Sequence, residues 1–148
     1  MSLDDWEQAG WLRKYETSAK EISNLLSLVG RDLKDSLQEE ISLDWRFNIA
    51  YNAALQLATL ILYSSGYRTG RGESKHYRVI QAISLIMGNQ LNPIRDYLDS
   101  CRRKRNTSEY DAVGTVSEKE FNDLIRTARD FKIQVIDWLR KNHPDLIE

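Results

Sequence analysis

The segment between residues 43 and 65 constrains the fold more than any other part of the sequence. Ser42 suits the N-cap of a helix, Gly66 suits its end, and no proline lies between them. Apolar side chains are spread around much of the helix: Phe47, Ala50, Tyr51, Ala54, Leu55, Leu57, Ala58, Ile61 and Leu62. A helix that is apolar on most sides is buried among other elements. The segment therefore predicts the central helix of a bundle.

One line of amides interrupts that apolar surface. Asn48, Asn52 and Gln56 recur every four residues and so share a face of the central helix. Amides in this position either hydrogen-bond to neighbouring helices or lie on an exposed edge, or they form the wall of a cleft or a self-association face. We favour the first interpretation.

The rest of the chain also predicts helices, because helix breakers are scarce: 148 residues contain 2 prolines and 7 glycines. Helices are expected near residues 4–15, 18–37, 75–88, from 92 into a basic string at 102–106, and 117–142. Capping boxes at Ser18–Glu21 and Ser117–Glu120 begin two of them. No segment reads as a strand. We predict an all-α, up-and-down bundle of four main helices plus one or two short accessory helices. It is one domain, with an accessory helix in residues 1–17 and the bundle in 18–148.

Composition excludes several classes of protein. Charged residues make up 29% of the chain and hydrophobic residues 41%, which is typical of a globular domain and not of a disordered one. The single cysteine excludes an internal disulfide framework. The longest apolar stretch, residues 53–63, is well short of the roughly 20 apolar residues of a membrane span. With no recognisable signal peptide, we expect a cytoplasmic protein.

Charge is distributed unevenly along the chain, although the net charge is only −1. Residues 61–110 contain 9 basic and 4 acidic residues, and the expected helix there ends in four consecutive cations, Arg102, Arg103, Lys104 and Arg105. Asp99 precedes Arg103 by four residues, and Glu109 follows Arg105 by four. Such exposed ion pairs are worth only about 0.5 kcal/mol each and do not explain the cluster. It is either a solvated basic face or a surface for a phosphate-rich partner.

Other catalytic or metal-binding patterns are missing from the sequence. Neither His76 nor His143 has a carboxylate or a second histidine at the helical spacing of a metal site. Cys101 is expected to be a small buried residue on an apolar helix face. The three glycines of residues 66–74 do not have Walker-loop spacing, so this segment is predicted to be a connecting loop. We expect no metal ion and no other cofactor.

Three strings of residues carry a family resemblance. They are Arg46 with Ala50-Tyr51-Asn52-Ala53-Ala54-Leu55-Gln56, then Gly66-Tyr67 followed by Lys75-His76-Tyr77-Arg78-Val79, then Arg105-Asn106-Thr107-Ser108-Glu109-Tyr110. In this order, over roughly residues 18–142, they resemble the HEPN domain, a helical bundle of prokaryotic toxin ribonucleases and nucleotidyltransferase partners. The third string is similar to the family's motif of arginine, polar residue, spacer and histidine.

The resemblance implies a site and an activity. Active HEPN proteins cleave RNA without a metal ion, usually in a cleft between two protomers; the arginine holds the scissile phosphate and the histidine moves protons. It implies that Arg105 and Tyr110 occupy the catalytic positions and that four further residues bind phosphate: Arg102, Arg103, Lys104 and Asn106. Tyr110 replaces the histidine, and a phenol of pKa near 10 is only about 0.1% ionised at pH 7. The replacement costs about two to three orders of magnitude in general-base catalysis.

Two functions are compatible with these residues. The first is an HEPN-like domain that binds RNA or a nucleotide-bearing partner through residues 102–110, with weak or absent ribonuclease activity of the toxin–antitoxin type. The second is a non-catalytic interaction protein, either a helical homodimer or the partner of a nucleotidyltransferase-like antitoxin. A DNA-binding helix-turn-helix has less support, because no tight turn leads into a short recognition helix.

Overall fold

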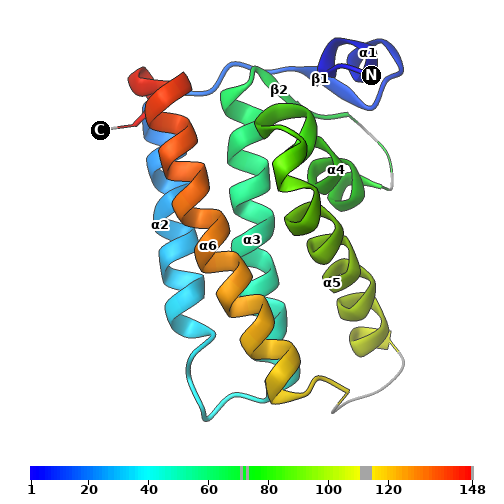
Figure 1. The fold of residues 1–148 in the computed structure, drawn as a ribbon, viewed down its shortest axis with the longest axis vertical. Helices are drawn as coiled ribbons and strands as arrows, with labels where there is room; N and C mark the ends of the chain where they lie inside the picture. Colours follow the sequence, from blue (N-terminus) through cyan, green and yellow to red (C-terminus); the bar gives the residue numbers. More distant parts are fainter. Residues whose placement is uncertain (71, 73, 111–114, 148) are drawn as a thin grey trace.

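Four long helices form an up-and-down bundle in the computed structural model of this chain (Figure 1). They are α2 (Ala19–Asp35), α3 (Leu43–Ser64), α5 (Asn92–Tyr110) and α6 (Glu118–Asn142). The helices α2 and α5 run in one direction and α3 and α6 in the other. The structure describes the backbone of residues 1–70, 72, 74–110 and 115–147, and the side chains of these residues except 106–110. The predicted all-α bundle is confirmed.

Shorter helices complete the architecture. The helix α1 (Leu3–Gln8) lies at the N-terminus, and α4 (Lys75–Met87) connects α3 to α5. Two 3-10 turns, η1 (Asn89–Leu91) and η2 (Pro144–Leu146), precede α5 and follow α6. Among the described residues, none of the helices combines the length and the apolar character that crossing a membrane requires.

The central position predicted for residues 43–65 is confirmed. The helix α3 packs against α2, α4, α5 and α6. Ser42 Oγ accepts a hydrogen bond from the Trp45 N–H at its start, and Gly66 follows its end with a φ of 92°, a backbone conformation that favours glycine. Buried residues lie all around α3: Phe47, Asn48, Ala50, Tyr51, Ala53, Ala54, Leu57, Ala58, Leu60, Ile61, Leu62 and Ser64.

Two amides of the line on α3, Asn48 and Gln56, lie against the rest of the bundle. Gln56 Nε2 donates a hydrogen bond to Asp32 Oδ2 on α2 at 3.0 Å, and Asn48 is 8% exposed. Gln56 therefore bonds to a neighbouring helix as expected, whereas the Asn48 Oδ1 atom is buried without a hydrogen-bond partner in the described part of the chain.

The two expected capping boxes differ. Ser117 and Glu120 form the reciprocal pair at the start of α6. At the start of α2, Ser18 accepts from the Glu21 N–H, but the Glu21 carboxylate accepts hydrogen bonds from the hydroxyls of Tyr15 and Thr17 instead. The second half of that predicted capping box is therefore wrong, because two hydroxyls compete for the carboxylate.

The prediction that the chain has no strands is wrong. Strand β1 (Leu12–Lys14) pairs antiparallel with β2 (Tyr67–Thr69), so the first helix ends at Gln8 rather than Tyr15, and part of the expected loop after Gly66 is a strand. Lys14 Nζ donates to the Tyr67 hydroxyl at 2.8 Å, and that hydroxyl donates to the Asp4 carboxylate. Three-residue strands are too short to show a period of two, and their pairing joins segments more than 50 residues apart.

Candidate nucleic-acid interface

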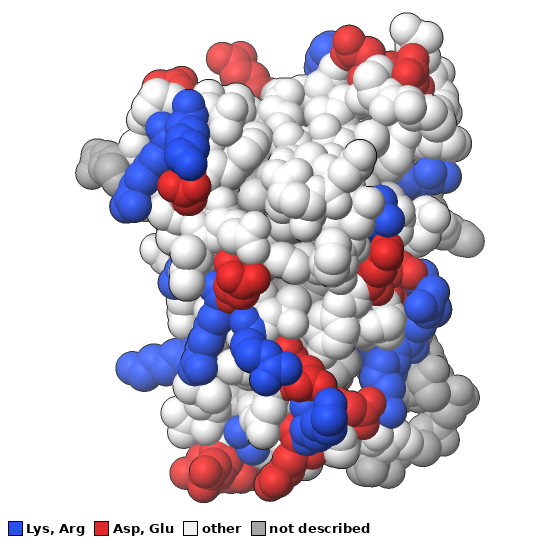
Figure 2. Space-filling view, viewed as in Figure 1, with Lys and Arg blue, Asp and Glu red and all other residues white. Residues whose placement is uncertain are grey.

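The C-terminal half of α5 carries the four consecutive cations. Figure 2 shows basic side chains over the lower part of this helix, with acidic side chains above them. Arg102 Nε donates to Asp99 Oδ1 at 2.9 Å, and Arg103 Nη1 donates to Asp99 Oδ2 at 3.0 Å. Asp99 is only 8% exposed. The predicted pair of Asp99 with Arg103 is confirmed, and the same carboxylate also orders Arg102.

Lys104 connects α5 to the start of α6. Its ammonium donates to the backbone carbonyl of Thr115 at 2.8 Å and lies 3.3 Å from Glu120 Oε2. The pKa of Glu120 is below its ordinary value, first because the carboxylate accepts the backbone N–H of Ser117 and then because Lys104 is close. Lys104 therefore has a structural contact in addition to its predicted role in phosphate binding.

Arg105 lies against the central helix. Its guanidinium carbon is 5.6 Å from the centroid of the Tyr51 ring on α3, and the residue is half-buried. Tyr51 is 1% exposed, and burial raises the pKa of its hydroxyl, against the opposing effects of Arg105 and Arg102. Tyr51 therefore provides an aromatic face and not a proton-transfer group.

The start of α4 completes the cluster. The ring of His76 lies 6.2 Å from that of Tyr51, and the guanidinium carbon of Arg102 lies 5.4 Å from the centroid of the Tyr77 ring. Tyr77 is 37% exposed. Three helices thus bring aromatic rings and guanidinium groups together. Spacing along the chain could not reveal this, because Tyr51, Tyr77 and Arg102 come from three different elements.

The remaining motif residues lie at the end of α5. The helix continues to Tyr110, so Asn106 and Tyr110 are four residues apart on one helix, as the sequence predicted. Their side chains, and that of Glu109, lie outside the part of the chain whose side chains the structure describes. The predicted roles of Asn106 and Tyr110 and the predicted pair of Glu109 with Arg105 stay predictions.

Other candidate groups are unsuited to catalysis. Cys101 is 3% exposed, and burial raises the pKa of its thiol to about 11, so it is the small buried residue that was expected. No group of three or more His, Cys, Asp or Glu residues within the described part of the chain could hold a metal ion.

Comparisons with known proteins identify no relative of this chain. The chain matches no protein-family model, no curated protein and no solved structure. The HEPN resemblance is thus a prediction from three strings of residues. The case for function depends on the geometry of the cluster.

Proposed function

We propose that this protein binds single-stranded RNA through the basic end of α5, which comprises Arg102, Arg103, Lys104 and Arg105, together with the ring of Tyr77. The observation that carries the proposal is the interleaving of cations and aromatic rings. Arg102 lies against Tyr77 and Arg105 against Tyr51, at 5.4 and 5.6 Å. Surfaces that bind single strands combine cations for the backbone with aromatic faces for the bases.

Charge supports a polyanionic ligand. The guanidinium groups of Arg102 and Arg103 share one carboxylate, that of Asp99, which carries a single negative charge. A guanidinium can hold two phosphate oxygens at once, whereas an ammonium acts as a point charge. Arg102 has further N–H groups besides the Nε–H that is bonded to Asp99, and these can contact a phosphate.

The exposed tyrosine favours a single strand over a duplex. Unpaired bases stack on aromatic side chains, whereas bases inside a duplex offer no free face. The ring of Tyr77 is partly exposed beside Arg102, while Tyr51 is buried and only supports Arg105. The resemblance of residues 105–110 to a motif of RNA-cleaving proteins points to the same ligand.

We expect binding with weak or absent cleavage, because Tyr110 stands where the family motif has histidine. A homodimer and a nucleotidyltransferase-like partner stay predictions.

The test measures binding of a fluorescein-labelled, mixed-sequence oligoribonucleotide by anisotropy, with a chelator present, at several salt concentrations. Arg105→Ala is compared with wild type and with Arg129→Ala, which removes an exposed arginine from α6 outside the cluster. We expect Arg105→Ala to weaken binding about tenfold and to lower the slope of log affinity against log salt by about 0.7. Arg129→Ala should bind like wild type.

Cleavage is followed in the same samples by gel electrophoresis. Equal binding and equal cleavage by wild type and Arg105→Ala would reject the site. Salt-insensitive self-association without RNA binding would favour the interaction protein. Oligodeoxyribonucleotide of the same sequence serves as the comparison for RNA preference.

A further inference from the structure

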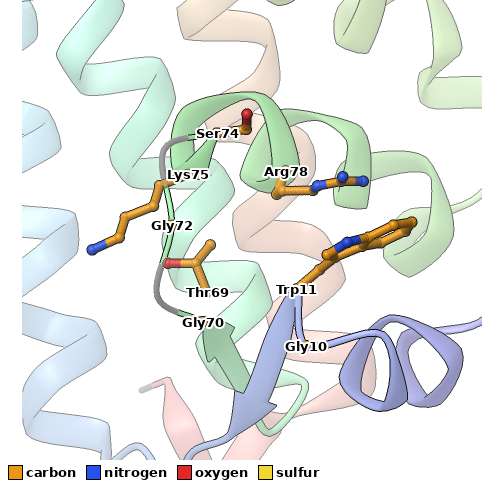
Figure 3. A pocket seen from close by; sticks show the side chains of 8 residues that line it. All are labelled: Gly10, Trp11, Thr69, Gly70, Gly72, Ser74, Lys75 and Arg78. Atoms are coloured by element: carbon orange, nitrogen blue, oxygen red, sulfur yellow. The ribbon is translucent and has the colours of Figure 1, made fainter.

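A second basic site lies at the first turn of α4, next to the proposed RNA interface: the guanidinium carbon of Arg78 is 5.7 Å from the centroid of the Tyr77 ring. A cavity of about 180 Å³ opens between the two-stranded β1–β2 sheet and the first turn of α4 (Figure 3). Its lining includes Trp11, Thr69, Gly70, Ser74, Lys75 and Arg78. No carboxylate is among the described residues that line it. The cavity is thus cationic and polar, with one aromatic wall.

Aromatic rings hold Arg78 at this cavity. Its guanidinium carbon lies 3.6 Å from the centroid of the Trp11 ring and 5.8 Å from that of Trp6. Figure 3 shows the Arg78 side chain extended over the indole of Trp11. Within the described part of the chain, no acidic side chain pairs with Arg78. Stacking therefore fixes the guanidinium plane and leaves its N–H edge for a ligand.

The start of α4, close to Arg78 in the sequence, has no side-chain cap. Ser74 is the N-cap of the 13-residue helix α4, but its side chain accepts no hydrogen bond from the first turn, which contains no acidic residue. The hydroxyl of Thr69 also lines the cavity. Lys75 projects from the first turn on the side opposite Arg78 (Figure 3). The lining of one cavity thus includes two hydroxyls, two cationic residues and the positive end of a helix, with Arg78 as the cation that faces Trp11.

Gly70 allows two segments that line this cavity, at Gly10 and at Gly70, to approach each other closely. A Cβ at Gly70 would lie 2.5 Å from the backbone oxygen of Gly10, and the Gly70 N–H donates to the carbonyl of Trp11 at 2.9 Å. This close approach of two backbones holds Trp11 beside the start of α4, where its ring contacts Arg78. The site is therefore built by contacts between the N-terminal segment and the segment after α3.

We propose that this cavity binds the phosphoryl group of a phosphate monoester. Three terminal phosphate oxygens can use the guanidinium edge, the hydroxyl of Ser74 and the N–H groups of the first turn of α4 together, which a carboxylate with two oxygens cannot do. A volume of about 180 Å³ is below the roughly 300–1,000 Å³ typical of drug-sized ligand sites, so it suits the phosphoryl group and little of what is attached to it. Because Arg78 covers the face of Trp11, the indole positions the arginine and does not stack on a base.

The test uses the full chain and isothermal titration calorimetry with inorganic phosphate, a nucleoside 5′-monophosphate, and the corresponding nucleoside as the control without phosphate. We expect the monophosphate to bind and the nucleoside not to bind. Arg78→Gln should weaken monophosphate binding at least tenfold, and Ser74→Ala by severalfold. Lys132→Ala, which removes a cation from α6, should bind like wild type.

Two further arms separate this site from the proposed RNA interface. Arg105→Ala should leave monophosphate binding unchanged, while Ser74→Ala, which keeps the contact of Arg78 with Tyr77, should leave the binding of 5′-hydroxyl RNA unchanged. An oligoribonucleotide that carries a 5′-phosphate, compared with its 5′-hydroxyl form, shows whether an RNA end or a free monoester supplies the phosphoryl group. A tighter complex with the 5′-phosphate that is lost in Arg78→Gln would identify the RNA end.

The proposal is overturned by two results. The first is that the wild-type protein does not bind inorganic phosphate, binds the monophosphate no more tightly than the nucleoside, and binds 5′-phosphorylated RNA no more tightly than 5′-hydroxyl RNA. The other is equal binding of the phosphate ligand by wild type, Arg78→Gln and Ser74→Ala. Because Ser74 is exposed, its replacement does not disturb the core, and it keeps the test decisive even if Arg78→Gln loses stability.

Discussion

The guanidinium carbon of Arg105 lies 5.6 Å from the centroid of the Tyr51 ring, and Tyr51 is 1% exposed. This contact joins the basic end of α5 to the buried centre of α3. It makes the position of Arg105, the cation proposed to contact RNA phosphate, depend on the packing of the core. The consequences can be tested by changing the ring and its hydroxyl separately.

Removing only the hydroxyl of Tyr51 should leave the protein intact. That oxygen is buried and has no hydrogen-bond partner in the described part of the chain, so its burial is unfavourable. We expect Tyr51→Phe to leave the free energy of unfolding unchanged or raise it by up to about 1 kcal/mol, with unchanged RNA affinity, because the ring under Arg105 is kept. Tyr51→Ala removes the ring and should cost about 3–5 kcal/mol. Urea denaturation checks both, and a loss above about 1 kcal/mol in Tyr51→Phe would mean that the hydroxyl is bonded.

Removing the charge of Asp99 should lower the stability of the protein without lowering its affinity for RNA. Asp99 is largely buried and orders Arg102 and Arg103, so Asp99→Asn should lower the free energy of unfolding by about 1–3 kcal/mol. It also removes a negative charge beside the proposed RNA path, so RNA affinity at low salt should not fall. Thermal denaturation and anisotropy measure the two effects. A loss of RNA affinity as large as that of Arg105→Ala would contradict the prediction.

Two glycine-to-alanine replacements should act in opposite directions. At Gly70 the new Cβ would lie 2.5 Å from the Gly10 backbone oxygen, so Gly70→Ala should push the segments around Gly10 and Gly70 apart. We expect it to lower the free energy of unfolding by about 1–3 kcal/mol. At Gly30, inside α2, the Cβ would meet nothing within 4 Å, so Gly30→Ala should stabilise by about 0.5–1 kcal/mol. Chemical denaturation of the two variants against wild type provides the comparison. Equal effects would show that Gly70 is not a close-approach position.

Glu120 should make stability depend on acid pH. Its pKa in the folded protein is below the ordinary 4.5, because the Ser117 N–H and then Lys104 favour the carboxylate. When the pH falls, the unfolded chain takes up this proton first. The stabilisation is therefore complete above about pH 4.5 and is lost as the pH falls through the lower folded pKa.

The matched variants are Glu120→Gln and Glu118→Gln, which alter neighbouring acids in the same turn of α6. At pH 7, Glu120→Gln should be less stable than wild type by about 0.5–1 kcal/mol, and this difference should shrink as the pH falls below about 4.5. Glu118→Gln should follow wild type more closely, because Glu118 has no part in the capping box. Chemical denaturation at several pH values measures these differences. A difference between wild type and Glu120→Gln that does not change with pH would contradict the assignment.

The helices were predictable because their evidence is local. Ser42 and Gly66 bracket α3, and Ser117 with Glu120 begins α6, each through hydrogen bonds or backbone angles within a few residues. The apolar surface of residues 43–65 predicted a central position, which the packing of α3 confirms. The pair of Asp99 with Arg103 was predictable for the same reason, because four residues span one helical turn.

The strands and both proposed sites depend on contacts between distant segments. The β1–β2 pairing joins residues 12–14 to 67–69, and no local period indicates it. The Tyr51–Arg105 contact and the Trp11–Arg78 contact each unite two elements that the sequence treats separately. Local hydrogen bonding and apolar periodicity thus specified the helices from the chain alone, whereas only the packed bundle decided which aromatic ring lies beside which cation. The physical reason is that stacking acts through space between whichever side chains the core brings together.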